Sequence, residues 1–398
     1  MTRLIEITGK ALSGEWGKDD DSGNGIPVLR TTNFTNIGEV DYENVVTRNI
    51  IKKNLDEKYL RKGDIIIEKS GGSDKQPVGR VIFFDGEERT YLFNNFTGLL
   101  RVKDQANWYP RYIFYSLFSN YRKGGTRAFE NKTTGLHNLK TDEYVAHYEV
   151  ADASMQNQIT ICAQLDRVTK NIKLHQQELQ KLDQLIKSRF VEMFGDPLFN
   201  TSGWEEIVLS AATIKIGSGA TPKGGKESYQ NEGISFIRSM NVHDGRFEYK
   251  DLAHITDVQA KQLDNVSVKE GDVFINITGA SVARSCIVPK EILPARVNQH
   301  VAIIRCDKTK LNPIFANNMF LNERFKKLLL SIGELGGATR QAITKQQLEM
   351  LTIILPPLKL QNQFADFVNQ VDKSKVAVQK SLDETQLLFD SLMQKYFG

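Results

Sequence analysis

The sequence predicts an α+β fold in which two globular domains alternate with two long antiparallel coiled-coil helices, as an internal pseudo-two-fold repeat. Three observations support this prediction. The chain repeats itself with a period near 205 residues. The first part of each repeat carries short strand signals, and the last part carries an apolar heptad pattern. A repeat of this length indicates that one structural unit occurs twice in the chain.

The duplication is visible in five short segments that recur in the same order. Residues 25–33 return as 233–241 and residues 60–67 as 268–275 (offset 208), Asn94 and Arg101 as Asn298 and Arg305 (offset 204), residues 155–159 as 360–364 (offset 205), and Phe194-Gly195 as Phe397-Gly398 (offset 203). Between these segments the two halves differ widely. We therefore expect the halves to share a fold but not a surface.

The first part of each half has the signals of a mixed domain. A Gly-Asp pair precedes a short β-branched or aromatic run at residues 63–67 and again at 271–275, which is typical of a turn followed by a strand. Residues 110–118 and 313–320 each begin with proline and continue as an apolar segment. Proline is favoured in the first turn of a helix, so a helix is predicted at both places.

The last part of each half predicts a long helix. Residues 154–194 contain no proline or glycine, and Gly195 and Pro197 then end the segment, while Pro356-Pro357 precedes the second one. A helix of about 40 residues is about 60 Å long, so the pair is expected to be a rigid spacer. The predicted interhelix seam comprises Leu165, Val168, Ile172, Leu179, Leu182 and Ile186 in the first helix, and Val368, Val371, Val378, Leu382, Phe389 and Leu392 in the second.

These elements divide the chain into four segments. The predicted globular domains are residues 1–152 and 196–355, and the predicted spacer helices are residues 153–195 and 356–398.

The composition excludes several classes of protein. No apolar run approaches the ~18 residues of a membrane span, and the three cysteines have neither metal-ligand nor disulfide-framework spacing. We therefore expect a cytoplasmic protein without membrane contact and without a bound metal. A net charge of +4 permits a polyanionic partner without requiring one.

Two similar domains with different surfaces on a rigid spacer suit a target with two different half-sites. This geometry equally fits an adaptor whose two heads bind proteins. The two hypotheses differ in salt dependence, because DNA binding weakens steeply with salt through counterion release.

The order of several short motifs resembles that of the specificity subunits of type I restriction–modification systems. The motifs are Trp204-Glu205-Glu206-Ile207, Gly217-Ser218-Gly219-Ala220-Thr221-Pro222, Gly233-Ile234-Ser235-Phe236-Ile237-Arg238, Gly271-Asp272-Val273, Thr278-Gly279, Asn298-Gln299, and Pro356-Pro357-Leu358 with Gln361. The resemblance covers the whole chain. The first half departs from the pattern because it lacks the opening tryptophan and has Ala151-Asp152-Ala153 where the second has Leu355-Pro356-Pro357.

The resemblance implies the biological setting. The globular parts would be target recognition domains that bind double-stranded DNA at a bipartite asymmetric site. The partners would be two adenine methyltransferase (modification) subunits and, through them, the restriction subunits. The methyl donor would bind the partner, so no cofactor is expected on this chain.

Three kinds of segment are candidates for DNA contact. The repeated Arg-x-x-Asn offers arginine for guanine or phosphate and asparagine for adenine, although a strand end with a turn asparagine would look the same. The loop after each Gly-Asp strand offers glycine, hydroxyl and lysine groups, and two glycine-rich basic loops offer mobile arginines; ordinary connecting loops or hinges are the alternatives. The candidate residues are Arg30, Asn33, Arg238 and Asn241; Lys69, Ser70, Lys75, Thr278 and Gly279; and Arg127, Arg340 and Gln341.

An enzymatic function is not predicted. Asn312-Pro313-Ile314-Phe315 is similar to the Asn-Pro-Pro-Phe/Tyr loop of adenine methyltransferases but lacks the second proline, and no glycine-rich cofactor loop precedes it. Asp64 and Glu68 are carboxylates of the nuclease type, but no Glu-x-Lys or Asp-x-Lys completes a metal site around them. A single-chain restriction enzyme is therefore disfavoured, and no catalytic residue is predicted.

Overall fold

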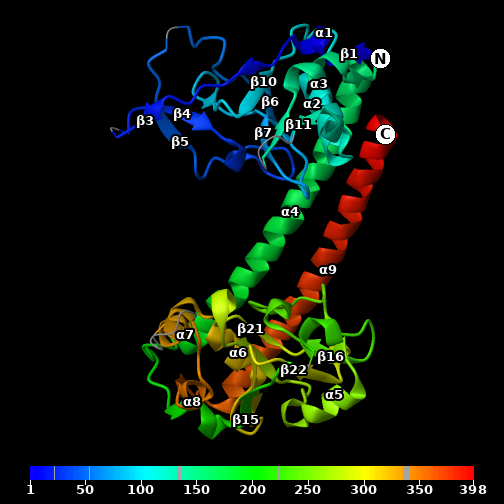
Figure 1. Ribbon diagram of the computed structural model, residues 1–398. Coiled ribbons are helices and arrows are strands. Elements are labelled where there is room, and N and C mark those ends of the chain that lie inside the picture. Colours follow the sequence, from blue (N-terminus) through cyan, green and yellow to red (C-terminus); the bar gives the residue numbers. More distant parts are fainter. Residues whose placement is uncertain (22, 53, 132–135, 223, 335–340) are drawn as a thin grey trace. The chain divides into compact units, whose positions relative to one another are not determined.

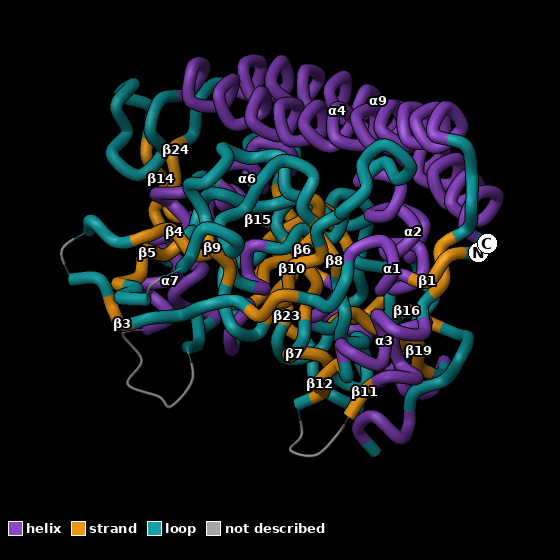
Figure 2. Tube along the Cα trace, turned by 90° about the horizontal axis from the view of Figure 1, so that it is seen from above, coloured by secondary structure: helices purple, strands orange, loops and turns teal. Residues whose placement is uncertain are grey.

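The computed structural model describes residues 1–21, 23–52, 54–131, 136–222, 224–334 and 341–398, which form two compact units. Unit 1 comprises Met1–Gln176 with Lys380–Gly398, and unit 2 comprises Gln177–Gln379. Both units contain parts of the helices α4 (Met155–Phe194) and α9 (Leu358–Phe397), which run without interruption (Figures 1 and 2). We call residues 1–154 domain 1 and residues 195–357 domain 2. The α+β class and the duplication are as predicted.

Domain 1 is built around an antiparallel four-stranded sheet in the order β2–β10–β6–β8. Side chains of the central strand β6 alternate between two cores. Ile65 and Ile67 face the cluster formed with the helices, whereas Ile66 faces a second sheet. The strands of the first sheet are β2 (Leu12–Ser13), β6 (Ile65–Glu68), β8 (Val81–Phe83) and β10 (Thr97–Leu100).

The remaining strands of domain 1 form smaller sheets at the edges of this core. The second sheet has the order β3–β5–β4–β9, and a third has the order β11–β12–β7. These elements are β3 (Lys18–Asp19), β4 (Ile26–Leu29), β5 (Val46–Asn49), β9 (Leu92–Phe93), β7 (Ser70–Gly72), β11 (Glu130–Asn131), β12 (His137–Leu139), the pair β1 (Thr2–Arg3) and β13 (Glu149–Val150), and the helices α1 (Leu4–Thr8), α2 (Pro110–Arg122) and α3 (Thr141–His147).

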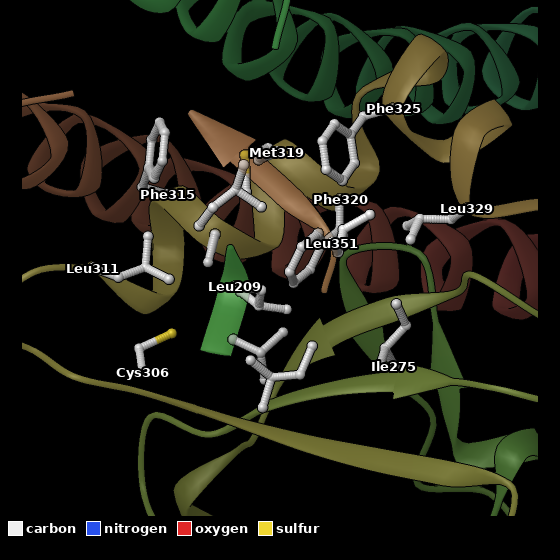
Figure 3. Close-up of a cluster of buried hydrophobic side chains, with 14 of the residues drawn as sticks. Leu209, Ile275, Cys306, Leu311, Phe315, Met319, Phe320, Phe325, Leu329 and Leu351 are labelled. Carbon is white, nitrogen blue, oxygen red and sulfur yellow. The ribbon is translucent and has the colours of Figure 1, made fainter. Parts of the chain in front are cut away.

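Domain 2 repeats this plan. Its central sheet has the order β15–β23–β20–β21, and Val273 and Ile275 of β20 face a cluster with the helices while Phe274 faces the other side. Figure 3 shows part of the helix-facing cluster, with Ile275 opposite Phe320. The strands are β15 (Thr213–Ser218), β20 (Val273–Asn276), β21 (Ser285–Ile287), β23 (Val301–Cys306), β16 (Ile234–Ile237), β19 (Ala253–Ile255), β22 (Ala295–Val297), β17 (Val242–His243), β18 (Arg246–Phe247), β14 (Glu206–Val208) and β24 (Thr352–Ile354); the helices are α5 (Asp257–Gln262), α6 (Pro313–Leu321), α7 (Glu323–Glu334) and α8 (Lys345–Glu349).

A buried arginine–carboxylate fork explains why two of the sequence anchors recur. Arg101 donates from Nε and Nη2 to the two oxygens of Asp64 at 2.7 and 2.6 Å. Arg305 donates to Asp272 in the same way at 2.7 and 2.8 Å. Each arginine also holds a loop carbonyl, and each aspartate accepts a backbone N–H three residues earlier. The fork therefore joins the start of the central strand to its neighbour and to a loop.

A buried glutamine lies in the first turn of each long helix. The contacts of the two glutamines show that the sequence alignment of the two halves must be moved by two residues here. The Gln158 side chain accepts from the Tyr109 N–H at 2.8 Å and donates to the carbonyls of Asn107 and Ala153. Gln361 does the same for Asn312, Lys310 and Pro356. The equivalent of Gln361 is thus Gln158, an offset of 203, and the offset of 205 taken from the sequence was wrong here.

Within each unit, α4 packs against α9 through apolar side chains. In unit 1, Leu165, Val168 and Ile172 share a buried cluster with Phe389. In unit 2, the predicted seam residues Ile186, Val368 and Val371 are buried with three phenylalanines that the prediction missed, namely Phe190, Phe194 and Phe364. Leu179, Leu182, Val378, Leu382 and Leu392 are half-buried.

The missed phenylalanines have a simple geometric cause. The three–four spacing of the first helix, continued beyond Ile186, reaches Arg189 and Met193, but Phe190 and Phe194 occupy the buried positions. A straight α-helix drifts by about 20° per heptad relative to a strict seven-residue repeat, so the buried face moves by one residue along a long helix. The sequence feature that could have identified these residues is a pair of aromatic residues spaced four apart, on one face of a helix.

Candidate nucleic-acid interface

The loops at one end of the central strand bring together three of the candidate residues in domain 2, namely Thr278, Gly279 and Gln341. The strand β20 leads into Thr278 and Gly279, and the Gly279 N–H donates to the carbonyl of Gln341 at 2.9 Å. Thr278 and Ala342 form an isolated β-bridge. Two segments that the sequence treated as separate candidates therefore lie together, and Arg340 falls outside the described residues.

A chain of polar side chains continues this loop cluster. The Thr278 hydroxyl bonds with His300 Nδ1, and His300 Nε2 lies 3.2 Å from Gln299 Nε2. Thr221, in the loop after β15, donates to Gln299 Oε1. Three loops distant in sequence thus present amide, imidazole and hydroxyl groups at one place, which are groups that bond base edges and phosphates.

Domain 1 places different side chains at the same positions. The Lys69 N–H donates to the Phe96 carbonyl at 2.8 Å, just as the Ile277 N–H donates to the His300 carbonyl at 3.0 Å. Phe96 is therefore the equivalent of His300, and this residue is 54% exposed. Beyond Lys69 the chain enters β7, which pairs with β12. An exposed aromatic side chain in domain 1 thus stands where domain 2 has the imidazole of His300.

Two further candidates meet in domain 1. Arg127 donates to the carbonyl of Asp74 at 3.3 Å, so it lies beside the loop that contains Lys75. Both side chains are exposed. The Lys69 ammonium donates instead to the Ser13 hydroxyl at 2.7 Å, and its burial lowers its pKa below the usual value. Lys69 is therefore tied to the sheet, whereas the side chains of Lys75 and Arg127 are exposed to solvent.

Of the two glycine-rich basic loops, the one in domain 1 lies wholly within the described residues. Gly124 adopts a positive φ of 75° at the end of α2 and begins a short turn that includes Arg127. In domain 2 the glycine-rich segment falls on residues 335–340, outside the described residues, and the chain is described again from Gln341, next to the β-bridge of Ala342 with Thr278. In domain 1 the residue at the place of Ala342 is Asn138, which pairs with Ser70.

The asparagines of the repeated Arg-x-x-Asn motif are buried and have a structural role. Asn33 and Asn241 are 1% and 0% exposed. Each side-chain oxygen accepts the N–H of the preceding arginine, and each amide donates to a loop carbonyl, Asp41 or Glu248, at 3.0 Å. Buried groups with satisfied hydrogen bonds do not face solvent, so these asparagines hold their turns and do not present themselves to a base.

The arginines of this motif are half-buried and point toward the following loop. Arg30 Nη2 lies 3.4 Å from the carbonyl of Asn44, and Arg238 Nη2 donates to the carbonyl of Asp251. The Nε atom of each is buried without a partner among the described residues. The turn at Thr31 is tied to the end of β6 by Arg80, so it lies at the same end of the strand as the other candidates.

The acidic residues at this strand are neutralised by arginines. Asp64 lies in the fork with Arg101, and Glu68 accepts from Arg80 at 2.8 and 3.1 Å. Among the described residues, no group of three or more His, Cys, Asp or Glu side chains is placed to hold a metal ion. The three cysteines, Cys162, Cys286 and Cys306, are buried and unpaired, and burial raises the pKa of each thiol to about 12.

The duplicated fold matches a known family over nearly its whole length. A sequence profile described as "Type I restriction modification DNA specificity domain" matches residues 4–184 and again residues 203–385. The chain belongs to this family. Both copies of the profile end within a long helix, so each specificity domain includes a globular domain and most of the helix that follows it.

Individual relatives agree with this assignment. The MjaX type I restriction enzyme specificity subunit of Methanocaldococcus jannaschii is 21% identical over 383 residues, which is 93% of this chain and 85% of the relative. The type I restriction–modification S subunit of M. genitalium has a TM-score of 0.58 at 13% identity, covering 100% of this chain and 95% of the other. A chain from a study of type I system assembly has a TM-score of 0.54 at 18% identity, covering 100% and 96%. Both solved structures share the fold of this chain.

None of the helices in the described ranges combines the length and apolar character that a membrane crossing needs.

Proposed function

We propose that this specificity subunit binds a bipartite, asymmetric site in double-stranded DNA, with one half-site read by each domain. The main observation behind the proposal is that the two domains share the same framework but carry different side chains in their loops. The forks at Asp64 and Asp272 are the same in both domains, whereas the turn at the loop cluster carries Phe96 in one and His300 in the other. Shared residues that build a fold cannot distinguish two half-sites, so the residues that differ must do so.

The chemistry of the loop cluster gives each domain a different preference. The Gln299 and His300 side chains can donate and accept hydrogen bonds at base edges in the major groove. The exposed ring of Phe96 can contact a thymine methyl group or wedge between bases, and it offers no hydrogen bond. Lys75 and Arg127 would contact phosphates and position domain 1 on the duplex.

The subunit is proposed to act without chemistry of its own. The carboxylates at the two ends of β6, Asp64 and Glu68, are held by arginines in bidentate geometry, so they are not available to bind a catalytic metal. Methylation and cleavage would be carried out by partner subunits, and a methyltransferase would extrude the target adenine from the duplex.

Exposed leucines on the long helices suggest where the methyltransferase subunits bind. Leu185 of α4 lies in unit 2 and is 46% exposed, and Leu388 of α9 lies in unit 1 and is 51% exposed. With the helix offset of 203 the two residues are equivalent. One apolar docking position in each unit supports recruitment of two copies, with the restriction subunits joining through them.

Methylation sequencing of cells that carry this chain with its neighbouring methyltransferase tests the proposal. We expect a two-part, asymmetric adenine-methylated motif that disappears when this chain is deleted. Replacing residues 1–150 with the same domain of another specificity subunit should alter only one half of the motif. Unchanged methylation after the deletion would contradict the proposal, and a protein-bridging adaptor would then be the better hypothesis.

A further inference from the structure

Two equivalent arginines, one in each domain, have different surroundings. Arg80 directly precedes β8 and Arg284 directly precedes β21, the strands that pair with β6 and β20. The Glu68 N–H donates to the Arg80 carbonyl at 2.8 Å, and the Asn276 N–H donates to the Arg284 carbonyl at 2.9 Å. The two arginines therefore occupy the same position in the fold, at the end of the central strand where the candidate loops meet.

In domain 1 the charge of this arginine is paired with a carboxylate of the same domain. Arg80 donates from Nη2 and Nε to the two oxygens of Glu68 at 2.8 and 3.1 Å. The Glu68 side chain is 2% exposed. Arg80 also donates to the carbonyl of Thr31 at 3.2 Å. A carboxylate held in this bidentate geometry neutralises the guanidinium and fixes its direction.

In domain 2 the carboxylate is replaced by a neutral amide. Asn276 is fully buried, and its amide donates at 2.9 Å to the carbonyl of Ser239, the equivalent of Thr31. The asparagine thus makes the contact that Arg80 makes in domain 1. Its Oδ1 atom is buried without a hydrogen-bond partner among the described residues. The substitution therefore removes the negative charge from the place where the arginine would otherwise be held.

Arg284 keeps its positive charge in these surroundings. It is half-buried, and across the described ranges no hydrogen bond or ion pair involves its guanidinium group. No side-chain nitrogen of Arg284 is among the buried, unpartnered atoms of the described residues, so the guanidinium reaches solvent and can meet an external anion. Thr278 and Gly279 lie in the connection between β20 and Arg284, which places the arginine beside the loop cluster proposed to meet DNA.

We propose that Arg284 contacts a DNA backbone phosphate, and that domain 1 has no such contact at the equivalent position. The inference rests on the proposed DNA-binding function. A phosphate is favoured over a base because the DNA backbone carries the negative charge of the duplex, whereas the bases are neutral. A charge-assisted hydrogen bond from arginine to phosphate is strong and carries no sequence information.

The test measures the binding of the full-length chain, with its co-expressed methyltransferase subunit, to a labelled duplex that carries the methylated motif. Arg284→Ala should weaken binding about tenfold at low salt. The increase in Kd between 50 and 200 mM salt should be about 3.5-fold smaller than in the wild type, because one fewer counterion-releasing contact is made. Arg284→Lys should keep the salt dependence because it keeps the charge.

A second variant tests the comparison between the domains. Asn276→Glu restores the carboxylate of domain 1, so it should hold Arg284 inside and reproduce the effect of Arg284→Ala. The matched control is Lys308→Ala, which removes an exposed positive charge beside Gly271, at the opposite end of β20. This control should bind as the wild type does. If Asn276→Glu prevents folding, as judged by its melting temperature, Arg284→Ala decides alone.

Each outcome has a definite meaning. A wild-type salt dependence in Arg284→Ala would overturn the phosphate contact. Loss of discrimination at a single base pair in both the alanine and the lysine variants would overturn it in favour of base recognition. If the wild-type complex does not prefer the motif duplex over a scrambled one, the proposed function itself fails.

Discussion

Removing the charge of Asp272 should destabilise unit 2 far more than an ordinary surface mutation. The Asp272 side chain is 1% exposed and Arg305 is 17% exposed, and two hydrogen bonds join them at 2.7 and 2.8 Å. Breaking a buried pair costs about 3–5 kcal/mol because the remaining charge has no partner. Partial solvation of Arg305 lowers the expected cost of Asp272→Asn to about 2–4 kcal/mol. For a unit of this size, that corresponds to a fall in Tm of roughly 5–15 °C.

Differential scanning calorimetry of the full chain measures the effect. The matched control is Asp264→Asn, which removes a carboxylate that also pairs with an arginine in unit 2, Arg296, but is 65% exposed. This surface pair should contribute no more than about 1 kcal/mol. Asp64→Asn should produce the same large loss in unit 1, because the fork is repeated there. Equal, small shifts for Asp272→Asn and Asp264→Asn would refute the idea that the fork organises the domain.

Four other changes have defined outcomes. Gln361→Leu should cost about 2–4 kcal/mol in a denaturant titration, because one backbone N–H and two carbonyls lose their buried partner. Gly79→Ala should lower the Tm of unit 1, since the φ of 107° favours glycine and the new Cβ would lie 2.8 Å from Thr126 Cγ2. Leu185→Asp and Leu388→Asp should each remove one methyltransferase copy in native mass spectrometry, and only the double variant should remove both. The buried thiols, with their pKa raised to about 12, should resist a thiol reagent until the protein unfolds. Because the thiols ionise near pH 9 in the unfolded chain but not in the folded one, the free energy of unfolding should fall as the pH rises from about 9 towards 12.

The parts of the fold that the sequence predicted well are those set by local rules or by duplication. The strand after Gly63-Asp64 and the helix at Pro110 follow from turn and proline preferences, and the structure has β6 and α2 there. The recurrence of Asp64 and Arg101 as Asp272 and Arg305 was visible as a pattern. The cause of this recurrence could not be read from the sequence, because a hydrogen bond between residues 37 apart depends on how the strands pair.

The candidate site was predicted less well than the fold. Recurrence in both halves drew attention to Asn33 and Asn241, yet the structure buries both and uses them to hold turns. In a protein proposed to read two different half-sites, recurrence marks the framework, and the discriminating residues are expected where the halves differ. Phe96 was missed for that reason, since its equivalence to His300 is visible only through the backbone bonds that both carbonyls accept.

Unit 1 is discontinuous along the chain, and this has a consequence for its synthesis. Residues 380–398 complete the cluster in which Phe389 and Met393 cover Leu165 and Ile172. A ribosome adding about 5–20 residues per second needs roughly 10–40 s to make the intervening ~200 residues. During that time this cluster lacks its cover, while unit 2, which is continuous, can fold as soon as residue 379 has emerged. The half of the protein that is translated first is therefore completed last, and its exposed apolar surface is where a chaperone or a premature partner would bind in a growing cell.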